Sequence, residues 1–593
     1  MFFSQTVRLT SYSNLHTMNQ NYFRFRWHHF RRALGRQSKL IRLWLGNYVN
    51  RHLYGAWQKL GLMRWSFASW VLLIVISCIG VWSQLTGLDR FWLRTVPVAG
   101  GIYREAIVGR VRQVNPLYID NSATADVAEL VFSKLVRTNS QGEVKPDLAE
   151  SWQVSADKRT YTFKIRKNAK WHDGSIVNVN DILFTFKTIQ LPDARSVLAS
   201  SWDKVVVNAL DDQTVQFVLP ASYSSFMSAL GRVGILPEHS LKNVRPSQLR
   251  LDDFNRQPNG SGPFILERLE AKSETVTLRR NPDYFGGPAL LDKIQFVQFD
   301  DGAGAIDAYA KQNVDGIAQV DINKLAEVEK FNELTITPLR LPNYVGAFFN
   351  TARPALADPA VRQALGQSLD RSNIVADILK NQANVTHYPI PVGYPGFNPE
   401  AARISYQPTQ ARQTLTGKFT QRLKLVTSNT GVYPQIARRL AEQWRAVGVP
   451  IDIIELDNFN LQQNYIRPRQ YDILVYGEDL GGDSDVYSFW HSSQAADPGL
   501  NVSAYKNPQG DTLMEQARVG KDDVYRDQKY RDWVSLWAKD VPAVLLYSPY
   551  YLYAHTVDLT GVSTVGLTVP SDRLMHAERW AVRSQQAPYK QSQ

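Results

Sequence analysis

Apolar residues recur along the chain with two different periods, one typical of strands and one of helices. From Thr160 to Ile165 every second residue is apolar, as in a strand with one buried face. Between Pro434 and Val447 the apolar residues form one stripe of a helix, and Gly448 ends it. Tyr471 to Tyr476 contains three consecutive aliphatic residues, the pattern of a strand buried on both faces. The alternation of such segments predicts an α/β fold.

The order of the elements sets the direction of the strands in the second half of the chain. Strands predicted over Arg422 to Thr427, Ile451 to Leu456 and Tyr471 to Tyr476 are separated by helical segments. Such β-α-β steps make the strands parallel. The loops 428–433 and 477–490 therefore leave the sheet at the same edge, beyond the carboxyl ends of strands, where ligands bind in open α/β sheets.

The loop 477–490 combines glycine, acidic and aromatic residues. Its acids and aromatics are Glu478, Asp479, Asp483, Asp485, Tyr487, Phe489 and Trp490. Its glycines allow the backbone to approach a ligand closely. We interpret the loop as a ligand site in which Asp483, or else Asp485, binds a positive group while the aromatic side chains add apolar contact. Tyr433 and the helix start at Pro434 are expected to face the same cleft. The alternative is a solvated turn whose acids face water.

Further elements are predicted from local signals in the first half. Tyr103 to Val108 begins the fold as a strand, and the helix that follows it is expected to end at Val136. Asn178 is expected to cap a second helix, and Asp358 with Pro359 to begin a third.

The carboxyl end is predicted to contain a helix, a strand and a tail. Trp533 to Lys539 is expected to be helical and Val541 to Tyr547 to be a strand. The polar stretch after Arg583 is interpreted as a disordered tail.

Positive charge is concentrated at the amino end. Residues 1–64 contain eleven lysines and arginines and no acidic residue, which accounts for almost all of the net charge of +12. The rest of the chain has 56 basic and 55 acidic residues. This balance removes the electrostatic case for a large nucleic-acid surface, so no nucleic acid is expected as a partner. The basic tail also contains aromatic residues and is suited to lie on anionic membrane lipid, although it can equally be a plain extension of an anchor.

An uncharged segment, residues 65–88, follows the basic tail. It is long enough to cross a bilayer of about 30 Å at about 1.5 Å per residue. We therefore expect a single transmembrane helix at the cell membrane, with the amino terminus in the cytoplasm and everything after Asp89 outside. In a competing interpretation Val75 to Cys78 resembles a bacterial lipoprotein signal with Cys78 lipidated. Cys78 is the only cysteine, so the exported part has no disulfide.

Several short motifs lie in order between residues 101 and 579. They are Asn115-Pro116, Pro146 to Trp152, Tyr161 to Gly174, Gly260 to Phe264, Arg280 to Phe285, Phe349-Asn350, Asp358 to Leu365 and Tyr406 to Leu415. Together they resemble the extracytoplasmic solute-binding proteins of the oligopeptide, dipeptide and nickel ABC importers. The resemblance implies a two-lobed periplasmic-binding-protein type II architecture with mixed sheets and an interlobe cleft, here preceded by one transmembrane helix.

The resemblance and the charge pattern together divide the chain into seven expected parts. These are a basic cytoplasmic tail (1–64), a transmembrane anchor (65–88), a linker (89–101), the first part of lobe 1 (102–340), lobe 2 (341–544), the return to lobe 1 (545–583) and a disordered tail (584–593).

The resemblance also implies a function, namely capture of a solute between two closing lobes and delivery to an ABC permease with cytoplasmic ATPases. A peptide is the leading ligand, and we expect a monomer without a cofactor or enzymatic activity. The stretch Gly260 to Phe264 lacks the spacing of a nucleophile elbow. The chain has neither a P-loop nor a zinc-binding H-E-x-x-H motif.

The resemblance points to particular ligand contacts. Peptide binders of that family meet the terminal ammonium of the ligand with an aspartate in an Asp-Pro motif. Here the corresponding stretch is Asp483-Ser484-Asp485, without the proline, so the choice between the two acids stays open. Asn115 is a further expected contact.

Other ligands and other classes of protein were weighed against the peptide importer. A sugar remains an alternative ligand because of the aromatic residues. Nickel is disfavoured because the histidines after the anchor do not pair at ligand spacing, and no metal site is expected. His172 and Asp173 lie in a turn and are expected to be structural. A hydrolase using Asp483 and Asp485 is disfavoured, because two acids so close in a loop are usually solvated. A sensor or scaffold derived from a binding protein would account for the long tail.

Overall fold

The computed structural model describes residues 68–82, 93–138, 143–223, 225–267, 269, 274–401, 403–482, 485–520 and 522–588. The chain divides into two compact units, Met1–Thr95 with Gln586–Gln593, and Val96–Gln585. In the first unit, residues 68–82 form a helix whose large apolar side chains, such as Trp70, are exposed. In the part of the chain that the structure describes, no helix is both long and apolar enough to cross a membrane. The expected transmembrane helix over 65–88 is therefore not supported.

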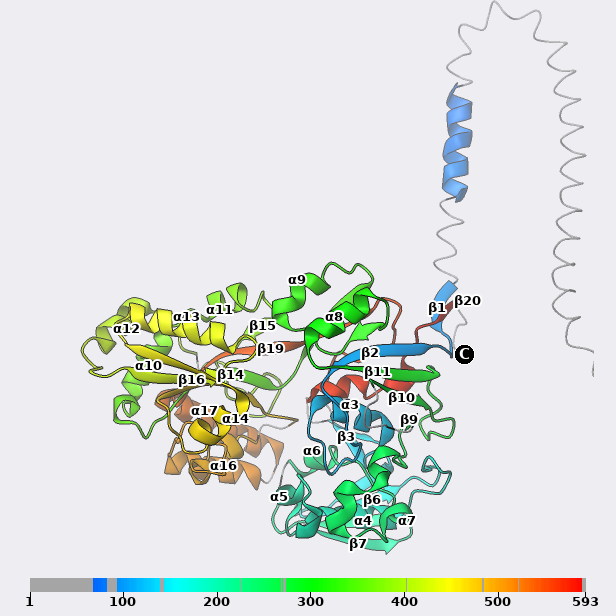
Figure 1. Cartoon of the computed structure of the whole chain (residues 1–593), viewed down its shortest axis with the longest axis horizontal. Coiled ribbons are helices and arrows are strands. Elements are labelled where there is room, and N and C mark those ends of the chain that lie inside the picture. The colour runs from blue at the N-terminus through cyan, green and yellow to red at the C-terminus, as the bar shows by residue number, and fades with distance from the viewer. Residues whose placement is uncertain are drawn as a thin grey trace, which may run out of the picture. The chain divides into compact units, whose positions relative to one another are not determined.

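The second unit is built around one large mixed sheet (Figure 1). Its path runs through β17 (Ile451–Leu456), β16 (Leu423–Ser428), β18 (Ile473–Asp479), β14 (Asn343–Phe349), β19 (Ala543–Thr556), β12 (Gly316–Ile317), β2 (Ile102–Val108), β11 (Lys293–Phe299), β10 (Thr275–Arg280) and β9 (Phe264–Leu266). Two further strands, β13 (Leu334–Arg340) and β15 (Ala383–Val385), also pair with β19.

Two groups of apolar cores divide this unit into two lobes. We call residues 96–341 with 550–585 lobe 1, and residues 343–548 lobe 2, because the buried apolar residues of each range pack with one another. The long strand β19 belongs to both lobes, since it pairs with β14 in lobe 2 and with β12 and β13 in lobe 1. The boundary expected after residue 544 thus falls inside a continuous strand.

Lobe 2 has helices on both faces of its strands (Figure 1). The helices α10 (Pro359–Gln367), α11 (Arg371–Asp377), α12 (Pro408–Leu415) and α13 (Tyr433–Ala446) pack on one face, and α15 (Tyr487–Trp490), α16 (Pro508–Arg518) and α17 (Asp523–Asp540) on the other. Apolar side chains therefore leave these strands on both sides, as the consecutive apolar residues in the sequence predict.

Lobe 1 adds a second, antiparallel sheet and several short helices. The sheet has the order β5 (Ala149–Val154), β6 (Thr160–Ile165), β8 (Thr214–Val218) and β7 (Val206–Asp211), and β3 (Val136–Thr138) pairs with β4 (Val144–Pro146). The helices used below are α3 (Ser122–Val131), α4 (Val179–Gln190), α5 (Ala199–Trp202), α6 (Phe226–Leu230) and η8 (Pro570–Leu574). The rest include α7 (Glu238–Leu241), α8 (Gly302–Ala310), α9 (Leu325–Val328) and, in lobe 2, α14 (Asn458–Asn460).

A buried ionic cluster joins the two chain segments of lobe 1. Arg573, on η8, donates to Asp126 on α3 at 2.8 and 2.7 Å and to Glu105 on β2 at 2.5 Å. Tyr553 on β19 donates to the other oxygen of Glu105 at 2.8 Å. The arginine is completely buried, so one positive charge is shared by two buried carboxyl groups where water cannot reach them.

Several predicted elements are confirmed. The strands β16 and β17 pair in parallel, and so do β16 and β18. Asn178 and Asp181 form a capping box at the start of α4, and Asp358 caps α10 ahead of Pro359.

Three predictions about element ends are wrong. The helix expected to reach Val136 ends at Val131, because Gly262 N donates to Val131 O at 2.8 Å and takes the carbonyl that a longer helix would use. The strand expected over 471–476 instead spans 473–479. The segment after Arg583 is a strand, β20 (Ser584–Pro588), paired with β1 (Leu93–Pro97), and residues 589–593 lie outside the described residues.

Candidate ligand-binding site

The predicted ligand loop leaves lobe 2 at the carboxyl end of β18. Because β18 runs parallel to β16, the segment after Ser428 leaves the sheet at the same edge. On its other side β18 pairs antiparallel with β14, with Glu478 opposite Tyr344 and Asp479 opposite Asn343. The first two acids of the predicted loop therefore belong to the strand.

Glu478 is a buried carboxyl beneath the loop. Tyr344 Oη donates to its Oε2 at 2.7 Å, and its Oε1 has no hydrogen-bond partner among the described residues. Burial raises the pKa of Glu478 from its ordinary 4.5 to about 8, and the bond from Tyr344 offsets this only in part. The group is therefore mostly neutral at pH 7.

Asp479 ends β18 on the side of lobe 1. Its Oδ1 accepts a bond from Gly481 N at 3.0 Å. Burial raises the pKa of Asp479, and the Gly481 amide and the positive charge of Arg232 in lobe 1 counteract that rise.

Of the two aspartates proposed as ammonium partners, the structure describes only one. Asp483 lies outside the described residues, so its role stays a prediction. Asp485 is described and already has a cationic partner, since Arg518 Nε lies 3.1 Å from its Oδ2. Asp485 also accepts the Tyr487 amide at 3.2 Å. The carboxylate of Asp485 is thus already bonded to groups of the protein itself.

Arg518 connects this loop to lobe 1. Its guanidinium lies over the ring of Tyr487 at 4.2 Å and over the ring of Tyr223, in lobe 1, at 5.3 Å. Asp485 and Tyr223 raise the pKa of Arg518 and more than offset the lowering by burial. One arginine thus contacts the ligand loop and the opposite lobe at once.

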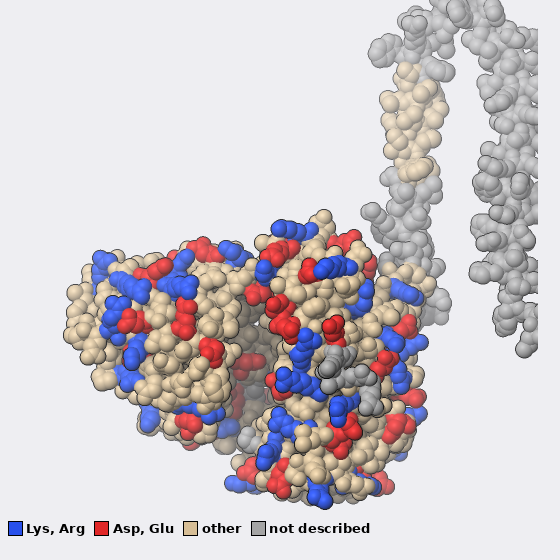
Figure 2. Space-filling view, viewed as in Figure 1, with Lys and Arg blue, Asp and Glu red and all other residues tan. Residues whose placement is uncertain are grey.

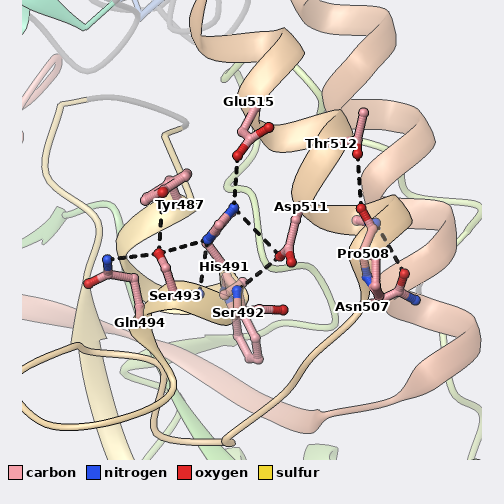
Figure 3. Close-up of polar contacts among 12 residues, drawn as sticks. Tyr487, His491, Ser492, Ser493, Gln494, Asn507, Pro508, Asp511, Thr512 and Glu515 are labelled. Atoms are coloured by element: carbon pink, nitrogen blue, oxygen red, sulfur yellow. Dashed lines mark hydrogen bonds and ion pairs between the residues drawn. The ribbon is translucent and has the colours of Figure 1, made fainter.

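The end of the loop contacts α16 at Ser492 and His491 (Figure 3). Tyr487 stacks on the His491 ring with centroids 4.0 Å apart. His491 Nε2 lies 3.4 Å from Glu515 Oε1, and Nδ1 lies 2.8 Å from Ser493 Oγ. Asp511, on the same helix, accepts the Ser492 amide at 2.9 Å. The loop and α16, which also carries Arg518, therefore form one connected structure.

The three aromatic residues of the loop differ in exposure. Tyr487 lines a cavity described below. Phe489 is half-buried against the lobe 2 core. Trp490 is completely buried, with its ring centroid 5.9 Å from that of Phe348 and 5.4 Å from that of Trp537. Trp490 is thus part of the core and offers no surface to a ligand.

Tyr433 and Asn115 are not brought together with the loop aromatics. Tyr433 packs with the core on the α13 face of lobe 2, whereas Tyr487 and Trp490 pack on the opposite face. Asn115 is fully buried in lobe 1 and donates to Asn255 Oδ1 at 2.8 Å. Its own Oδ1 accepts from Leu117 N at 3.0 Å, so it shapes a turn.

His172 has the geometry of a structural histidine. Its Nδ1 accepts from Gly260 N at 3.2 Å, and its Nε2 donates to Gly262 O at 3.1 Å. Burial lowers its pKa to about 4, so the ring is neutral at pH 7. Among the residues that the structure describes, no three histidine, cysteine, aspartate or glutamate side chains lie close enough together to hold a metal ion.

A cavity of about 690 Å³ lies between the lobes beside the ligand loop. Lobe 1 contributes Trp202, Tyr223 and Phe226 to its lining, and lobe 2 contributes Tyr487 and Arg518. Figure 2 shows a hollow between the two lobes on the face in view. The arrangement can enclose a small solute between aromatic side chains of both lobes.

A second cavity, of about 370 Å³, lies in lobe 1 where that lobe faces residues 481 and 482. Between the two cavities, Ser228 on α6 donates to Gly482 O at 3.2 Å. Arg232, just beyond α6, lines the smaller cavity. The ligand loop therefore meets lobe 1 between two hollows.

Sequence reasoning missed the contributions of lobe 1 and α16 to this site. Tyr223, Arg232 and Arg518 lie in segments whose sequence carries no ligand-binding motif. Arg518 is far from Asp485 along the chain, and only the fold brings them together. The proximity of Ser228 and Arg232 to the loop likewise follows from the way the lobes meet.

Comparison with known proteins shows which family has this architecture. Residues 143–498 match the family model of bacterial extracellular solute-binding proteins, family 5, middle part. The oligopeptide-binding protein AppA of Bacillus subtilis is 28% identical over 549 residues, covering 88% of this chain and 99% of AppA.

Solved structures show the same fold. The structure of Bacillus subtilis AppA in complex with a nonapeptide aligns with a TM-score of 0.68 and 27% identity, over 82% of this chain and 99% of AppA. The ABC transporter substrate-binding protein CtaP of Listeria monocytogenes aligns with a TM-score of 0.75 and 26% identity, again over 82% of this chain and 99% of its own. The chain therefore belongs to family 5 of the bacterial extracellular solute-binding proteins.

Proposed function

We propose that this protein is the extracytoplasmic substrate-binding component of an ABC importer and that it captures peptides between its two lobes for delivery to a permease. The observation that carries the proposal is the cavity of about 690 Å³ that both lobes line beside the loop after β18. Clefts and cavities of this size are typical of small-ligand sites. The peptide ligand is supported by the similarity to AppA, which extends over 99% of that oligopeptide-binding protein.

The terminal ammonium of the peptide is assigned to Asp483 rather than Asp485. Asp485 is already ion-paired with Arg518. An ammonium at Asp485 would have to displace that guanidinium from a partly buried position, at a cost in free energy. Asp483 is the other acid of the Asp483-Ser484-Asp485 stretch that the resemblance to peptide-binding proteins offers for this role.

Binding of the ligand is proposed to close the lobes without any chemical reaction of the ligand. Arg518 contacts rings from both lobes, so its contacts form fully only when the lobes are together. A ligand that favours the closed arrangement shifts the equilibrium toward it. We expect no turnover of the bound solute.

Membrane attachment is proposed to occur through residues 65–88. The helix 68–82 exposes Trp70, Ile74 and Trp82, with exposed fractions of 68%, 59% and 75%. Continuous exposed apolar surface of this kind marks membrane or protein contacts. In this proposal the basic tail stays in the cytoplasm. Replacing Cys78 by serine distinguishes the anchors, because only a lipoprotein would lose its processing and membrane retention.

A thermal-shift screen with peptides, sugars and nickel tests the proposed function. A ligand that binds only the folded state stabilises it by RT ln(1 + [L]/Kd), about 2.7 kcal/mol at a hundredfold excess over Kd. Peptides should raise the melting temperature and be recovered unchanged. A shift with sugars or nickel alone would replace the peptide assignment, and turnover of any ligand would contradict a binding protein.

A further inference from the structure

The smaller cavity of lobe 1 has an apolar floor and a charged rim. Its volume is about 370 Å³, and the apolar lining includes Ile119, Phe132, Leu198 and Met575. The charged residues of its lining are Glu129, Lys134, Arg232 and Asp572. Which charge is available to a ligand depends on how these four residues are already paired.

Three of the four charged residues have partners within lobe 1. Lys134 Nζ donates to Glu129 Oε2 at 2.6 Å, which pairs these two with each other. Asp572 accepts bonds from Thr568 N at 2.7 Å, from Thr568 Oγ1 at 2.6 Å and from Val569 N at 3.1 Å. Both acids and the lysine thus already have partners; Glu129 Oε1 is buried without a hydrogen bond, and Arg137 Nη1 lies 3.7 Å from it.

Arg232 is the fourth, and its guanidinium has no hydrogen-bond or ion-pair partner among the residues that the structure describes. The side chain lies against the backbone of the ligand loop. A Cβ atom built on Gly481 would lie 3.0 Å from Arg232 Nη2, and one built on Gly482 would lie 3.8 Å from it. Asp479 feels the positive charge of Arg232 but forms no ion pair with it and bonds to Gly481 N instead. The donors of Arg232 thus remain available where the two lobes meet.

We propose that Arg232 binds a carboxylate of the captured ligand while an apolar group of the ligand occupies the cavity beneath it. This inference rests on the proposed function and names the chemistry of its ligand, namely a peptide with a carboxylate next to an apolar group. The carboxylate belongs either to the carboxyl terminus or to an acidic side chain.

Local geometry favours an anion at this position. The planar guanidinium matches a carboxylate with two parallel hydrogen bonds, which an ammonium group does not provide. Because Gly481 and Gly482 carry no side chains, the loop leaves the guanidinium accessible.

The test uses an apolar tripeptide library prepared both as free acids and as carboxyl-terminal amides. A third preparation consists of amides with one glutamate at each position in turn. Peptides retained by the full protein are identified by mass spectrometry, and the affinities of retained sequences are measured by titration. The variants are Arg232→Gln, Arg232→Lys and the control Arg245→Gln, an exposed arginine of lobe 1 that lines none of the cavities described here.

We expect the parent to retain free acids, or glutamate-containing amides, over plain amides. Arg232→Gln should weaken that binding by about 30-fold, the lower end of the usual effect of removing one partner of an enclosed charge pair, because Arg232 is partly exposed. Arg232→Lys should weaken it less, and Arg245→Gln should not change it. The melting temperature without peptide should be unchanged in all variants, because the side chain of Arg232 makes no hydrogen bond or ion pair with the residues that the structure describes.

The outcomes separate the two proposals. Preference for free acids assigns the carboxyl terminus to Arg232, and preference for glutamate amides assigns a side chain. If the parent retains plain amides as well as acids, or if Arg232→Gln and Arg232→Lys both bind like the parent, this inference is overturned while peptide binding stands. Retention of no peptide from any preparation overturns the peptide function and this inference together.

Discussion

Two arginines, Arg573 and Arg518, stand between carboxylates and tyrosine rings, yet one is buried within a lobe and the other joins two lobes. Arg573 is completely buried and bonded to Asp126 and Glu105. The side chain of Arg518 is 31% exposed and contacts Asp485 in its own lobe and Tyr223 in the other. Opening the first arrangement would separate buried charges from one another, whereas the contact of Arg518 with Tyr223 can be broken while the ion pair with Asp485 stays intact. Similar groups thus make a permanent joint in one place and a reversible contact in the other.

The largest expected effect is on the permanent joint. Arg573→Met should lower the free energy of unfolding by about 3–5 kcal/mol, because Glu105 and Asp126 would remain buried without their partner. Urea unfolding measures the loss. The control Arg104→Met removes a partly exposed pair with Asp315 and should cost about 1 kcal/mol or less. Equal midpoints for Arg573→Met and the parent would show that the cluster is not a structural joint.

The next effect concerns the ligand loop. Asp483→Asn should weaken peptide binding by about 2–5 kcal/mol, roughly 30-fold to several thousandfold, because the ligand ammonium would be enclosed without a counter-charge. Titration with a peptide and its amino-acetylated form measures this loss, and the variant should no longer distinguish the two. Asp485→Asn should keep the distinction, since its carboxylate serves Arg518. The opposite pattern would make Asp485 the ammonium partner.

Glu478 sharpens the comparison, because it is a buried carboxyl paired with a tyrosine and with no arginine. Its folded pKa is raised from 4.5 to about 8, so between these values the folded state retains a proton that the unfolded state releases. Its contribution to stability is complete below about pH 4.5 and is lost as the pH rises through about 8.

Glu478→Gln should abolish this dependence. The variant should be more stable than the parent at pH 8, by on the order of 2 kcal/mol, and similar to it at pH 5. Thermal melts between pH 5 and pH 9 measure the difference. A constant difference across this range would mean that Glu478 does not change its protonation there.

The smallest effect is expected at the reversible contact. Arg518→Gln removes a partly exposed ion pair and two ring contacts, worth together about 1–2 kcal/mol, so peptide affinity should fall about 5-fold to 30-fold. Tyr223→Leu removes the lobe 1 part of the contact and should act in the same direction. Arg438→Gln, an exposed arginine paired with Glu455 in lobe 2, is the control and should have no effect. If Arg518→Gln bound peptide like the parent, the contact would have no part in closure.

The fold of lobe 2 was predictable because its signals are local. Each step from β16 to β18 follows from apolar periodicity and helix ends, and the parallel pairing follows from the order of elements. The extent of β18 was not predictable, because its last residues, Glu478 and Asp479, are acidic, which is typical of a loop. Only the pairing with β14 makes them part of a strand.

The site was less predictable than the fold, because its contacts join distant parts of the chain. The loop was found from its composition, but Trp490 proved to be a core residue, since nothing in a short aromatic run tells which ring faces inward. The Asp485 pair with Arg518, the approach of Arg232 and the burial of Asn115 depend on the packing of separate segments. The cluster of Glu105, Asp126 and Arg573 joins residues more than 400 positions apart.

Closure of the two lobes around a peptide is the central claim, and an interlobe distance tests it most directly. Lys242→Cys in lobe 1 and Lys418→Cys in lobe 2 place a fluorophore pair on exposed positions after Cys78→Ser removes the single native cysteine. Single-molecule energy transfer is then recorded with and without peptides retained in the library experiment. Peptide should shift a broad distribution of distances to a shorter and narrower one, and Arg518→Gln should require more peptide for the same shift. A distribution that saturating peptide leaves unchanged would contradict closure as the basis of binding.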